Sequence, residues 1–453
     1  TFDYVKPIDT GFFTVGFGKH SVMPAEPIPG KTTYYVAGYR VNHPATGVLD
    51  PMMAKAIYID DNTGRGGIVI CQIDSVGIMR HDVQIIRDKL ADFCKATGCR
   101  SINICSTHDH AGIDTMGLWG PLPKSGRNKE HIQAVIDGAV AAIEDAYRSR
   151  KDGSLYYGFC EIDPALYRDS RLPEVFSNKL HRFRFSPNDG GRDIYFVNFS
   201  SHSESLLGDN TLISADFPAY IAAEVEKEKS ADLVYTVGAI GGLIMMRPMD
   251  DDPVVSTKKT GRYLGKKLCE ITKEVKLPPA IQIISRELYV PCDNHVLLAA
   301  AKVGIIPAKP YATGVGSGAL NQSLLTEMTY MEIGNVKILL IPGEPFPENI
   351  YGGYLRSEES AEGKDPSINP PPLNSLVDGE LIVIGLANDE IGYMPPPNDF
   401  YLDPELPYVT QRKDRFDRRH YEETNSLGPE TSWHIYHAFR QMLDDVQEHK
   451  KLT

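Results

Sequence analysis

The chain has 453 residues, of which 42% are hydrophobic and 24% are charged, and its formal net charge is −13 at pH 7. A chain of this length can bury a large core, and its composition is ordinary for a globular protein. The acidic balance argues against a surface that binds nucleic-acid phosphates, and no apolar run reaches the roughly 18 residues that a membrane span requires.

Strand and helix patterns alternate from residue 67 onward. A strand-like apolar run occupies 67–77, and the next segment has apolar residues at helical spacing, which predicts a helix over 81–97. The apolar run 101–106 predicts another strand, and the one-sided apolar face of 129–149 predicts a second helix.

The rest of the chain continues this alternation. Further strands are predicted at 194–199, 233–237, 281–288, 336–341 and 381–386. Further helices are predicted near 217–229, 258–275 and 430–448. Continuous apolar strands that alternate with amphipathic helices are typical of α/β proteins whose sheets are covered on both faces. We therefore predict an α/β fold with mixed β-sheets flanked by helices and, because no linker divides the sequence, a single domain over 1–453.

Cysteine usage and the first residues bear on localisation. The chain has seven cysteines without a Cys-x-x-Cys pair, and Cys71 and Cys105 lie in strand-like runs. This pattern favours buried reduced thiols and a reducing compartment. Residues 1–4 contain neither an initiator Met nor a signal-peptide pattern. The localisation therefore stays open between the cytoplasm and export with removal of a signal peptide.

The segment Ser106–Gly112, Ser-Thr-His-Asp-His-Ala-Gly, follows the predicted strand 101–106. Residues two apart on an extended backbone point to the same side, so His108 and His110 can face one pocket. Two imidazoles at the mouth of a core strand can hold a divalent metal ion or orient a hydrolytic water. The alternative interpretation is one surface histidine and one core histidine that hydrogen-bonds to the backbone.

Three further polar clusters also follow apolar strands, and they contain His202, Glu344 and Tyr393. Open α/β sheets bind ligands outside the carboxyl ends of their strands, so these side chains could converge with His108 on one ion. Nitrogen and hard oxygen donors suit zinc with an open position for water. Each residue also has an ordinary structural interpretation: a surface histidine, a Pro-Gly-Glu turn or a packed tyrosine.

These motifs resemble those of the neutral/alkaline non-lysosomal ceramidase family. The family hallmark, a strand that ends in Ser/Thr-His-x-His-Ser/Ala-Gly, is matched by Thr107–Gly112, and its Pro-Gly-Glu motif by Pro342–Glu344. Asn198–His202 resembles its second histidine motif, and Asn388–Tyr393 is similar to its Asn-x-Tyr-Thr-x-Tyr segment. The resemblance runs over nearly the whole chain.

The resemblance implies a zinc-dependent amidohydrolase of lipid metabolism that cleaves an N-acyl amide bond, ceramide in a sphingolipid pathway, with a metal-activated water. It implies that Zn²⁺ is bound by His108, His202, Glu344 and Tyr393. His110 would be the acid/base for the water and the leaving amine. Arg171 would polarise the scissile carbonyl, with Arg168 as the competing arginine, and Tyr421 would hydrogen-bond the developing oxyanion.

The sequence also departs from the family. Glu390 stands where the family has the first tyrosine of its Asn-x-Tyr motif, and no counterpart of the family's C-terminal β-sandwich domain is recognised. The proline-rich segments 365–374 and 394–407 are expected to be loops beside the site, and they carry no stripe of Leu, Phe or Trp. Because a bilayer ceramide requires an apolar approach surface, we expect a more soluble N-acyl substrate, with long-chain ceramide a poor one.

Two other functions stay open at this point. Metallo-β-lactamase-type hydrolases also use His-x-His, but their pattern requires Asp and His directly after the pair, where Ala111 and Gly112 stand. A non-catalytic protein could bind a lipid or a glycan and use the polar strand ends structurally. The expected partner is a small N-acyl amide or lipid, without nucleic acid or a membrane span, and the oligomeric state is open.

Overall fold

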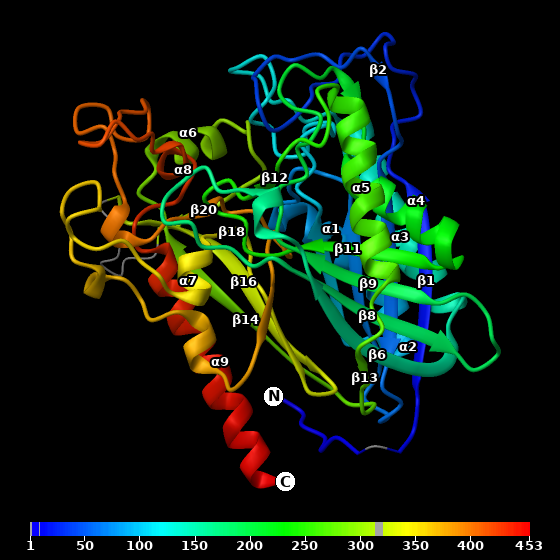
Figure 1. Ribbon diagram of the computed structural model, residues 1–453. Helices are drawn as coiled ribbons and strands as arrows, with labels where there is room; N and C mark the ends of the chain where they lie inside the picture. The colour runs from blue at the N-terminus through cyan, green and yellow to red at the C-terminus, as the bar shows by residue number, and fades with distance from the viewer. Residues whose placement is uncertain (1, 9, 313–319) are drawn as a thin grey trace.

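The computed structural model describes residues 2–8, 10–312 and 320–453, and these residues form an α/β fold with two larger sheets (Figure 1). The strands of the first sheet are β1 (Phe13–Ser21), β3 (Met53–Asp60), β4 (Ile68–Ile73), β5 (Ser101–Ser106), β6 (Lys151–Glu161), β8 (Lys179–Pro187), β9 (Ile194–Phe199), β11 (Asp232–Val237) and β13 (Glu274–Lys276). Their order is β11-β9-β8-β6-β1-β3-β4-β5, with β13 beside β6.

The second sheet is formed later in the chain. Its strands are β14 (Ile281–Pro291), β15 (Pro310–Ala312), β16 (Gln322–Ile333), β17 (Val336–Leu340) and β19 (Leu381–Ile384). Their order is β14-β16-β17-β19, with β15 beside β16. Both sheets are mixed. In the first, β4 and β5 run parallel and β3 and β4 antiparallel. In the second, β17 and β19 run parallel and β16 and β17 antiparallel.

Short strand pairs and helices complete the fold. The pairs are β2 (Gly47–Val48) with β10 (Leu212–Ile213), β7 (Tyr167–Arg168) with β12 (Met245–Met246), and β18 (Glu344–Pro345) with β20 (Tyr393–Met394). The α-helices are α1 (Arg80–Lys89), α2 (Ala91–Thr97), α3 (Lys129–Arg148), α4 (Phe217–Lys229), α5 (Pro253–Cys269), α6 (His295–Lys302), α7 (Pro347–Tyr351), α8 (Tyr421–Thr424) and α9 (Thr431–Leu452). Among the described residues, no helix combines the length and apolar character that a membrane span requires.

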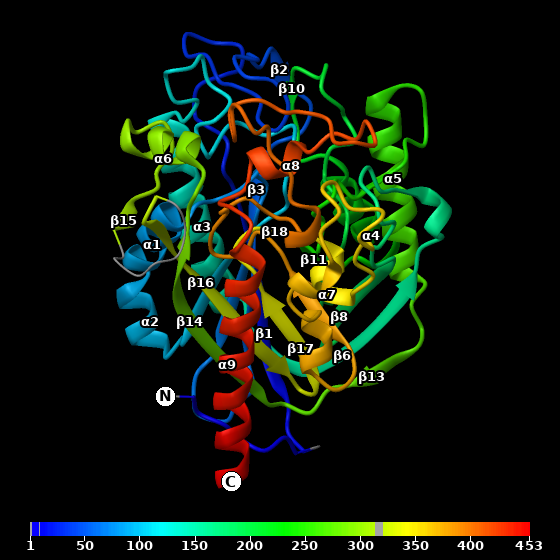
Figure 2. The same cartoon turned by 90° about the vertical axis from the view of Figure 1, so that its left-hand side faces the viewer.

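The two sheets pack face to face between layers of helices. One apolar cluster joins Val15, Ile57 and Phe183 of the first sheet to Met331 and Ile338 of the second. The outer face of the first sheet is covered by α3, α4 and α5, and the outer face of the second by α9 (Figures 1 and 2). The predicted α/β fold with mixed sheets and flanking helices is confirmed, although one face of each sheet is covered by the other sheet.

Several predicted boundaries were wrong. The helix expected over 81–97 is divided into α1 and α2 at Leu90, whose backbone (φ −97°, ψ 7°) leaves the helical region. The helix expected over 258–275 begins earlier, because Asp252 caps the amides of Val254 and Val255, and it ends at Cys269. The expected last turn of that helix is instead β13, which pairs with β6.

The segment after β19 connects the two sheets where the site lies. The amide of Gly385 donates to the carbonyl of Val237 at the end of β11 (3.0 Å). The amide of Ser106, at the end of β5, donates to the carbonyl of Leu386 (3.1 Å). The carboxyl ends of strands from both sheets therefore meet at one place.

Candidate metal centre

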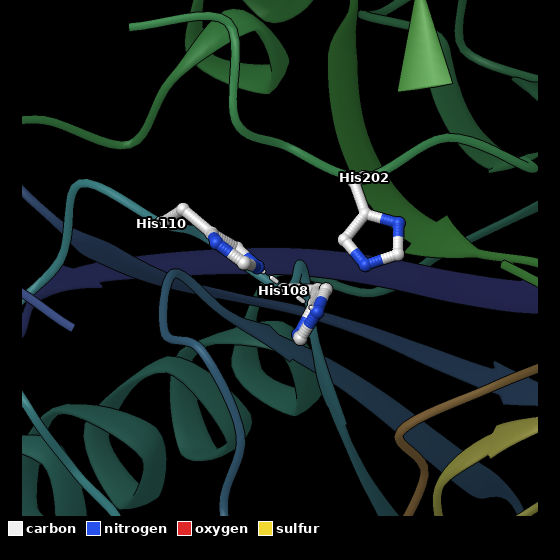
Figure 3. A group of neighbouring side chains, drawn as sticks. All are labelled: His108, His110 and His202. Atoms are coloured by element: carbon white, nitrogen blue, oxygen red, sulfur yellow. Dashed lines mark hydrogen bonds between the residues drawn. The ribbon is translucent and has the colours of Figure 1, made fainter. Parts of the chain in front are cut away.

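Three of the predicted metal ligands converge at the junction of the two sheets. Nε2 of His108 lies 2.9 Å from Oε1 of Glu344, and Nε2 of His202 lies 3.3 Å from the same oxygen. All three side chains are buried. Figure 3 shows that the rings of His108, His110 and His202 gather around one point, although they come from two separate loops.

The hydrogen bonds of the two Nδ1 atoms of His108 and His202 determine whether the Nε2 atoms carry a lone pair. Nδ1 of His108 is 2.7 Å from the carbonyl of Val76, and Nδ1 of His202 is 3.0 Å from that of Ile244. Because a carbonyl only accepts, each Nδ1 donates, and Nε2 of a neutral imidazole then carries a lone pair. When both rings are neutral, two lone-pair nitrogens face the carboxylate of Glu344. Nε2 of His202 and Oε1 of Glu344 have no hydrogen-bond partner among the described residues.

This arrangement fits a divalent cation. Converging nitrogen and oxygen lone pairs repel one another unless a proton or a cation lies between them. Two imidazoles and a carboxylate are a common donor set for zinc, and the Nδ1 bonds to backbone carbonyls are the usual way in which ligand histidines are oriented. The buried His/Glu cluster is therefore a possible metal-binding site.

The backbone at the histidine pair differs from the extended strand that we expected. His108 has a φ of 59°, in the left-handed region that residues other than glycine rarely adopt. The next amides are fixed by neighbouring loops: Asp109 donates to the carbonyl of Ser75 and His110 to that of Ser203, both at 2.9 Å. The two histidines do face one pocket, but a strained turn places them there rather than strand alternation.

His110 lies beside the three converging atoms. Its Nε2 is 3.0 Å from Nε2 of His108, and its Nδ1 is 3.5 Å from a carboxylate oxygen of Glu204, which accepts from the hydroxyl of Tyr39 (2.9 Å). Burial lowers the pKa of His110 well below its usual value, and His108 and His202 lower it further. The donor atoms of His108, His110 and His202 lie within 4.8 Å of one another. His110 is therefore close enough to be either a ligand or an acid/base.

The two predicted tyrosines line the same pocket as His108 and His110. Tyr393 is the register partner of Glu344 in the parallel β18–β20 pair, so both emerge side by side. Tyr421 begins α8, and its ring centroid is 6.0 Å from that of Tyr393. Burial raises the pKa of both phenols, and the Glu344 carboxylate adds to each shift.

Arg171 has other neighbours. Its buried guanidinium is paired with Asp399 (3.0 Å), Glu422 (3.2 Å) and Glu423. Because two of these carboxylates belong to α8, the contacts anchor the helix that carries Tyr421, and they direct the Arg171 nitrogens toward carboxylates rather than the histidines. Arg171 lines a small pocket with Asp399, not the pocket of His108.

Arg168, the competing arginine, is exposed on β7. Burial and the nearby Glu204 carboxylate raise the pKa of Tyr39, and the positive charge of Arg168 opposes that shift. Its charge therefore acts on the side of the site where Tyr39, Glu204 and His110 lie. Neither Arg168 nor Arg171 is among the described residues that line the pocket of His108.

Sequence reasoning missed the functional potential of Glu390, which it noted only as a departure from the family. Glu390 is 3% exposed and lines the pocket with His108 and Glu344. The donor atoms of these three residues lie within 4.8 Å of one another. The signal in the sequence was an acidic pair, Asp389 and Glu390, directly after an apolar strand.

The rest of the pocket is mainly apolar, with an empty space of about 800 Å³ that includes its mouth. Its walls include Val76, Met79, Trp119, Leu297, Leu298 and Ile306. Most of these residues come from segments 116–119 and 297–308, which the sequence analysis did not connect with the site. The segments 365–374 and 394–407 were expected to flank the site. Neither contributes a residue to the lining of the pocket, although Tyr393, which directly precedes the second segment, does.

The fold and site thus define an α/β protein with a buried His/Glu cluster at the floor of an apolar pocket. Its sequence matches the model of the family described as neutral/alkaline non-lysosomal ceramidase, N-terminal, over residues 30–255. The chain belongs to the neutral/alkaline non-lysosomal ceramidase family, as the sequence motifs predicted.

Two solved structures have a similar fold. The crystal structure of neutral ceramidase from Pseudomonas aeruginosa is 17% identical, with a TM-score of 0.72 over 97% of this chain and 75% of that chain. A structure of ceramidase complexed with C2 is 16% identical, with a TM-score of 0.69 over 97% of this chain and 76% of that one. At these identities the likeness shows a shared fold.

Proposed function

We propose that this chain is a zinc-dependent amidohydrolase that cleaves the N-acyl amide bond of a ceramide-type lipid. The observation that carries the proposal is the convergence of Nε2 of His108, Nε2 of His202 and Oε1 of Glu344 beside an apolar pocket. Tyr393, the register partner of Glu344, is the fourth ligand in this proposal. A bound zinc ion would act as a Lewis acid toward the amide carbonyl and make an attacking water more acidic.

His110 would move the protons of the reaction. Its Nε2 is adjacent to the cluster, and the lowered pKa keeps the ring neutral near pH 7, so it can accept a proton from the attacking water. The protonated ring can then donate to the leaving amine. Glu204, 3.5 Å from Nδ1, would stabilise the charged ring at that stage.

Two further groups would bind the carbonyl oxygen as negative charge develops on it. The raised pKa of Tyr421 keeps its hydroxyl protonated, so the phenol is a hydrogen-bond donor. For the arginine, the sequence predicted Arg171, but the contacts of Arg171 with three carboxylates favour an anchoring role. We therefore propose Arg168 as the arginine that contacts the substrate.

The apolar walls of the pocket support an acyl or alkyl chain as the part of the substrate that enters it. Each CH₂ group that moves from water into such a wall contributes about 0.8 kcal/mol. This pocket favours a lipid amide over the more soluble N-acyl compound that we expected from the polar loops 365–374 and 394–407. The substrate hypothesis is revised accordingly.

The proposal is tested by metal content and hydrolysis in one preparation. The purified protein should contain about one zinc per chain, release fatty acid from a long-chain ceramide in mixed micelles, lose this activity after chelation and recover it when zinc is restored. His202→Ala should reproduce the chelated state. A metal-free preparation that hydrolyses ceramide at the full rate, or a zinc-loaded one that cleaves no N-acyl amide, would refute the proposal.

A further inference from the structure

Glu390 holds a carboxylate in the wall of the metal centre in a defined orientation. Its Oε1 accepts a hydrogen bond from the amide of Gly392 (2.7 Å), and its own amide donates to Oδ1 of Asp389 (2.8 Å). The stem of the side chain packs closely on Gly77, where an added Cβ would lie 3.0 Å from Cβ and Cγ of Glu390. The side chain therefore has little freedom to turn away from the pocket.

The second carboxylate oxygen of Glu390 lacks a partner. Oε2 is buried and accepts no hydrogen bond from any described residue, although the side chain is only 3% exposed. A buried carboxylate oxygen without a donor is unfavourable unless a ligand satisfies it. A carboxylate oxygen of Glu390 lies within 4.8 Å of a donor atom of His108 and of one of Glu344.

The charges around the pocket indicate which kind of ligand is missing. Two carboxylates, Glu344 and Glu390, face the same space, and the described lining residues include no lysine or arginine that could neutralise them. A single divalent cation would allow both carboxylates to be ionised in this buried space. Metal–oxygen bonds of about 2.1 Å allow one ion to bridge donors separated by roughly 4 Å, so small side-chain shifts would suffice.

We propose that Glu390 is an additional protein ligand of the metal centre, so that two histidines, two carboxylates and Tyr393 hold the cation. This inference rests on the proposed metal site at His108, His202 and Glu344. Glu390 stands where the family motif has a tyrosine, so the carboxylate makes this centre richer in hard oxygen donors. The centre should accordingly bind Mn²⁺ more strongly, relative to Zn²⁺, than a centre without Glu390 would.

The experiment is a metal titration of the full chain after removal of metal, with Zn²⁺ for affinity and Co²⁺ for its visible absorption spectrum, which reports the ligand set. Glu390→Gln should weaken Zn²⁺ binding at least tenfold, weaken Mn²⁺ binding more, and change the Co²⁺ spectrum. The metal-free variant should be at least as heat-stable as the metal-free parent, because a buried unpartnered carboxylate has been removed. Glu405→Gln makes the same change in charge at an exposed position and should leave all of these values unchanged.

Two further variants separate the possible failures. Glu344→Gln tests the proposed metal site itself and should lose Zn²⁺. If Glu344→Gln loses Zn²⁺ while Glu390→Gln keeps the parent's affinity and Co²⁺ spectrum, Glu390 is not a ligand and the proposed function stands. If neither variant changes metal binding, both proposals are wrong. If Glu390→Gln does not fold, Glu390→Leu, which keeps the volume without oxygen donors, is read by the same criteria.

Discussion

His108 and His110 are only two positions apart, but their Nδ1 atoms have different partners. Nδ1 of His108 is bonded to a backbone carbonyl, whereas Nδ1 of His110 faces the carboxylate of Glu204. His108→Ala should therefore lose zinc. His110→Ala should keep zinc and lose turnover by about 100-fold or more, the usual effect of a missing acid/base. Metal analysis and kcat on both variants check this, and equal loss of zinc would make His110 a ligand.

His131, near the start of α3, should make the free energy of unfolding depend on pH. Both ring nitrogens are buried without a hydrogen-bond partner among the described residues, and burial lowers the pKa of His131 to about 3. The unfolded chain therefore takes up this proton first as the pH falls below about 6.5. The contribution of His131 to stability is complete above that pH and is lost progressively between about pH 6.5 and 3, by up to ~1.4 kcal/mol per pH unit.

The variant His131→Leu should remove this part of the pH dependence. Urea unfolding at several pH values between 7.5 and 4.5 should give a shallower decline in the free energy of unfolding for the variant than for the parent. The two proteins should differ little at pH 7.5, because the replaced nitrogens had no partners. Identical slopes for the parent and the variant would show that His131 is not buried in its neutral form.

Residues of the site could be predicted from the sequence only where a general rule about their position applied. Polar residues after apolar strands indicated His108, His202 and Glu344, because the carboxyl ends of strands are where α/β folds gather ligands. The turn at His108 could not be predicted, because bonds to separate loops impose its left-handed backbone. The position of Glu390 depends on how the loop after β19 crosses to β5, which no local pattern encodes.

At the scale of elements, most strands with mainly apolar sequences were predicted, whereas β8, which contains buried charged residues, was missed. β5, β9 and β11 were found because most of their residues are apolar. β8 was not predicted because it contains Arg182 and Arg184, which look unsuitable for a central strand. Both arginines pair with Glu274 on β13, about ninety positions later, and that partner makes the strand possible.

This pairing leads to a prediction on stability. Arg182 is 2% exposed, so Glu274→Gln leaves a buried guanidinium without its counter-charge and should destabilise the fold by about 3 kcal/mol. The matched control is Glu226→Gln, which breaks the exposed pair with Arg192 and should cost less than ~1 kcal/mol. Chemical denaturation of both variants measures the difference. Equal effects would show that the Arg182 pair is solvated in solution.

At the scale of the whole molecule, the pocket is built from segments distant in sequence, with α6 forming one wall beside the metal centre. Ala301 lines the pocket, whereas Ala299 on the same helix is exposed. Ala301→Phe should therefore reduce kcat/KM for a long-chain N-acyl amide about tenfold more than for a short-chain one, since volume changes in apolar pockets have effects of this order. Ala299→Phe should leave the ratio of the two substrates unchanged. A ratio unaffected by Ala301→Phe would mean that the acyl chain lies elsewhere.

The α/β class of the whole molecule was predictable from the sequence, whereas the packing of its two sheets was not. Alternation of strands and helices indicated the α/β class, and the His-x-His motif alone left two hydrolase classes and a binding protein open until the family match decided among them. The face-to-face contact of the sheets was not predictable, because Ile57 and Ile338 lie in apolar runs that would suit a cover of helices equally well.

A crystal structure of the zinc-loaded chain, with diffraction recorded at the zinc absorption edge, tests the proposed metal centre directly. We expect one anomalous peak about 2.0–2.3 Å from Nε2 of His108, Nε2 of His202 and a carboxylate oxygen of Glu344. A crystal grown with zinc that shows no peak among these three residues, or shows a fully occupied zinc only at other residues, would contradict the central claim.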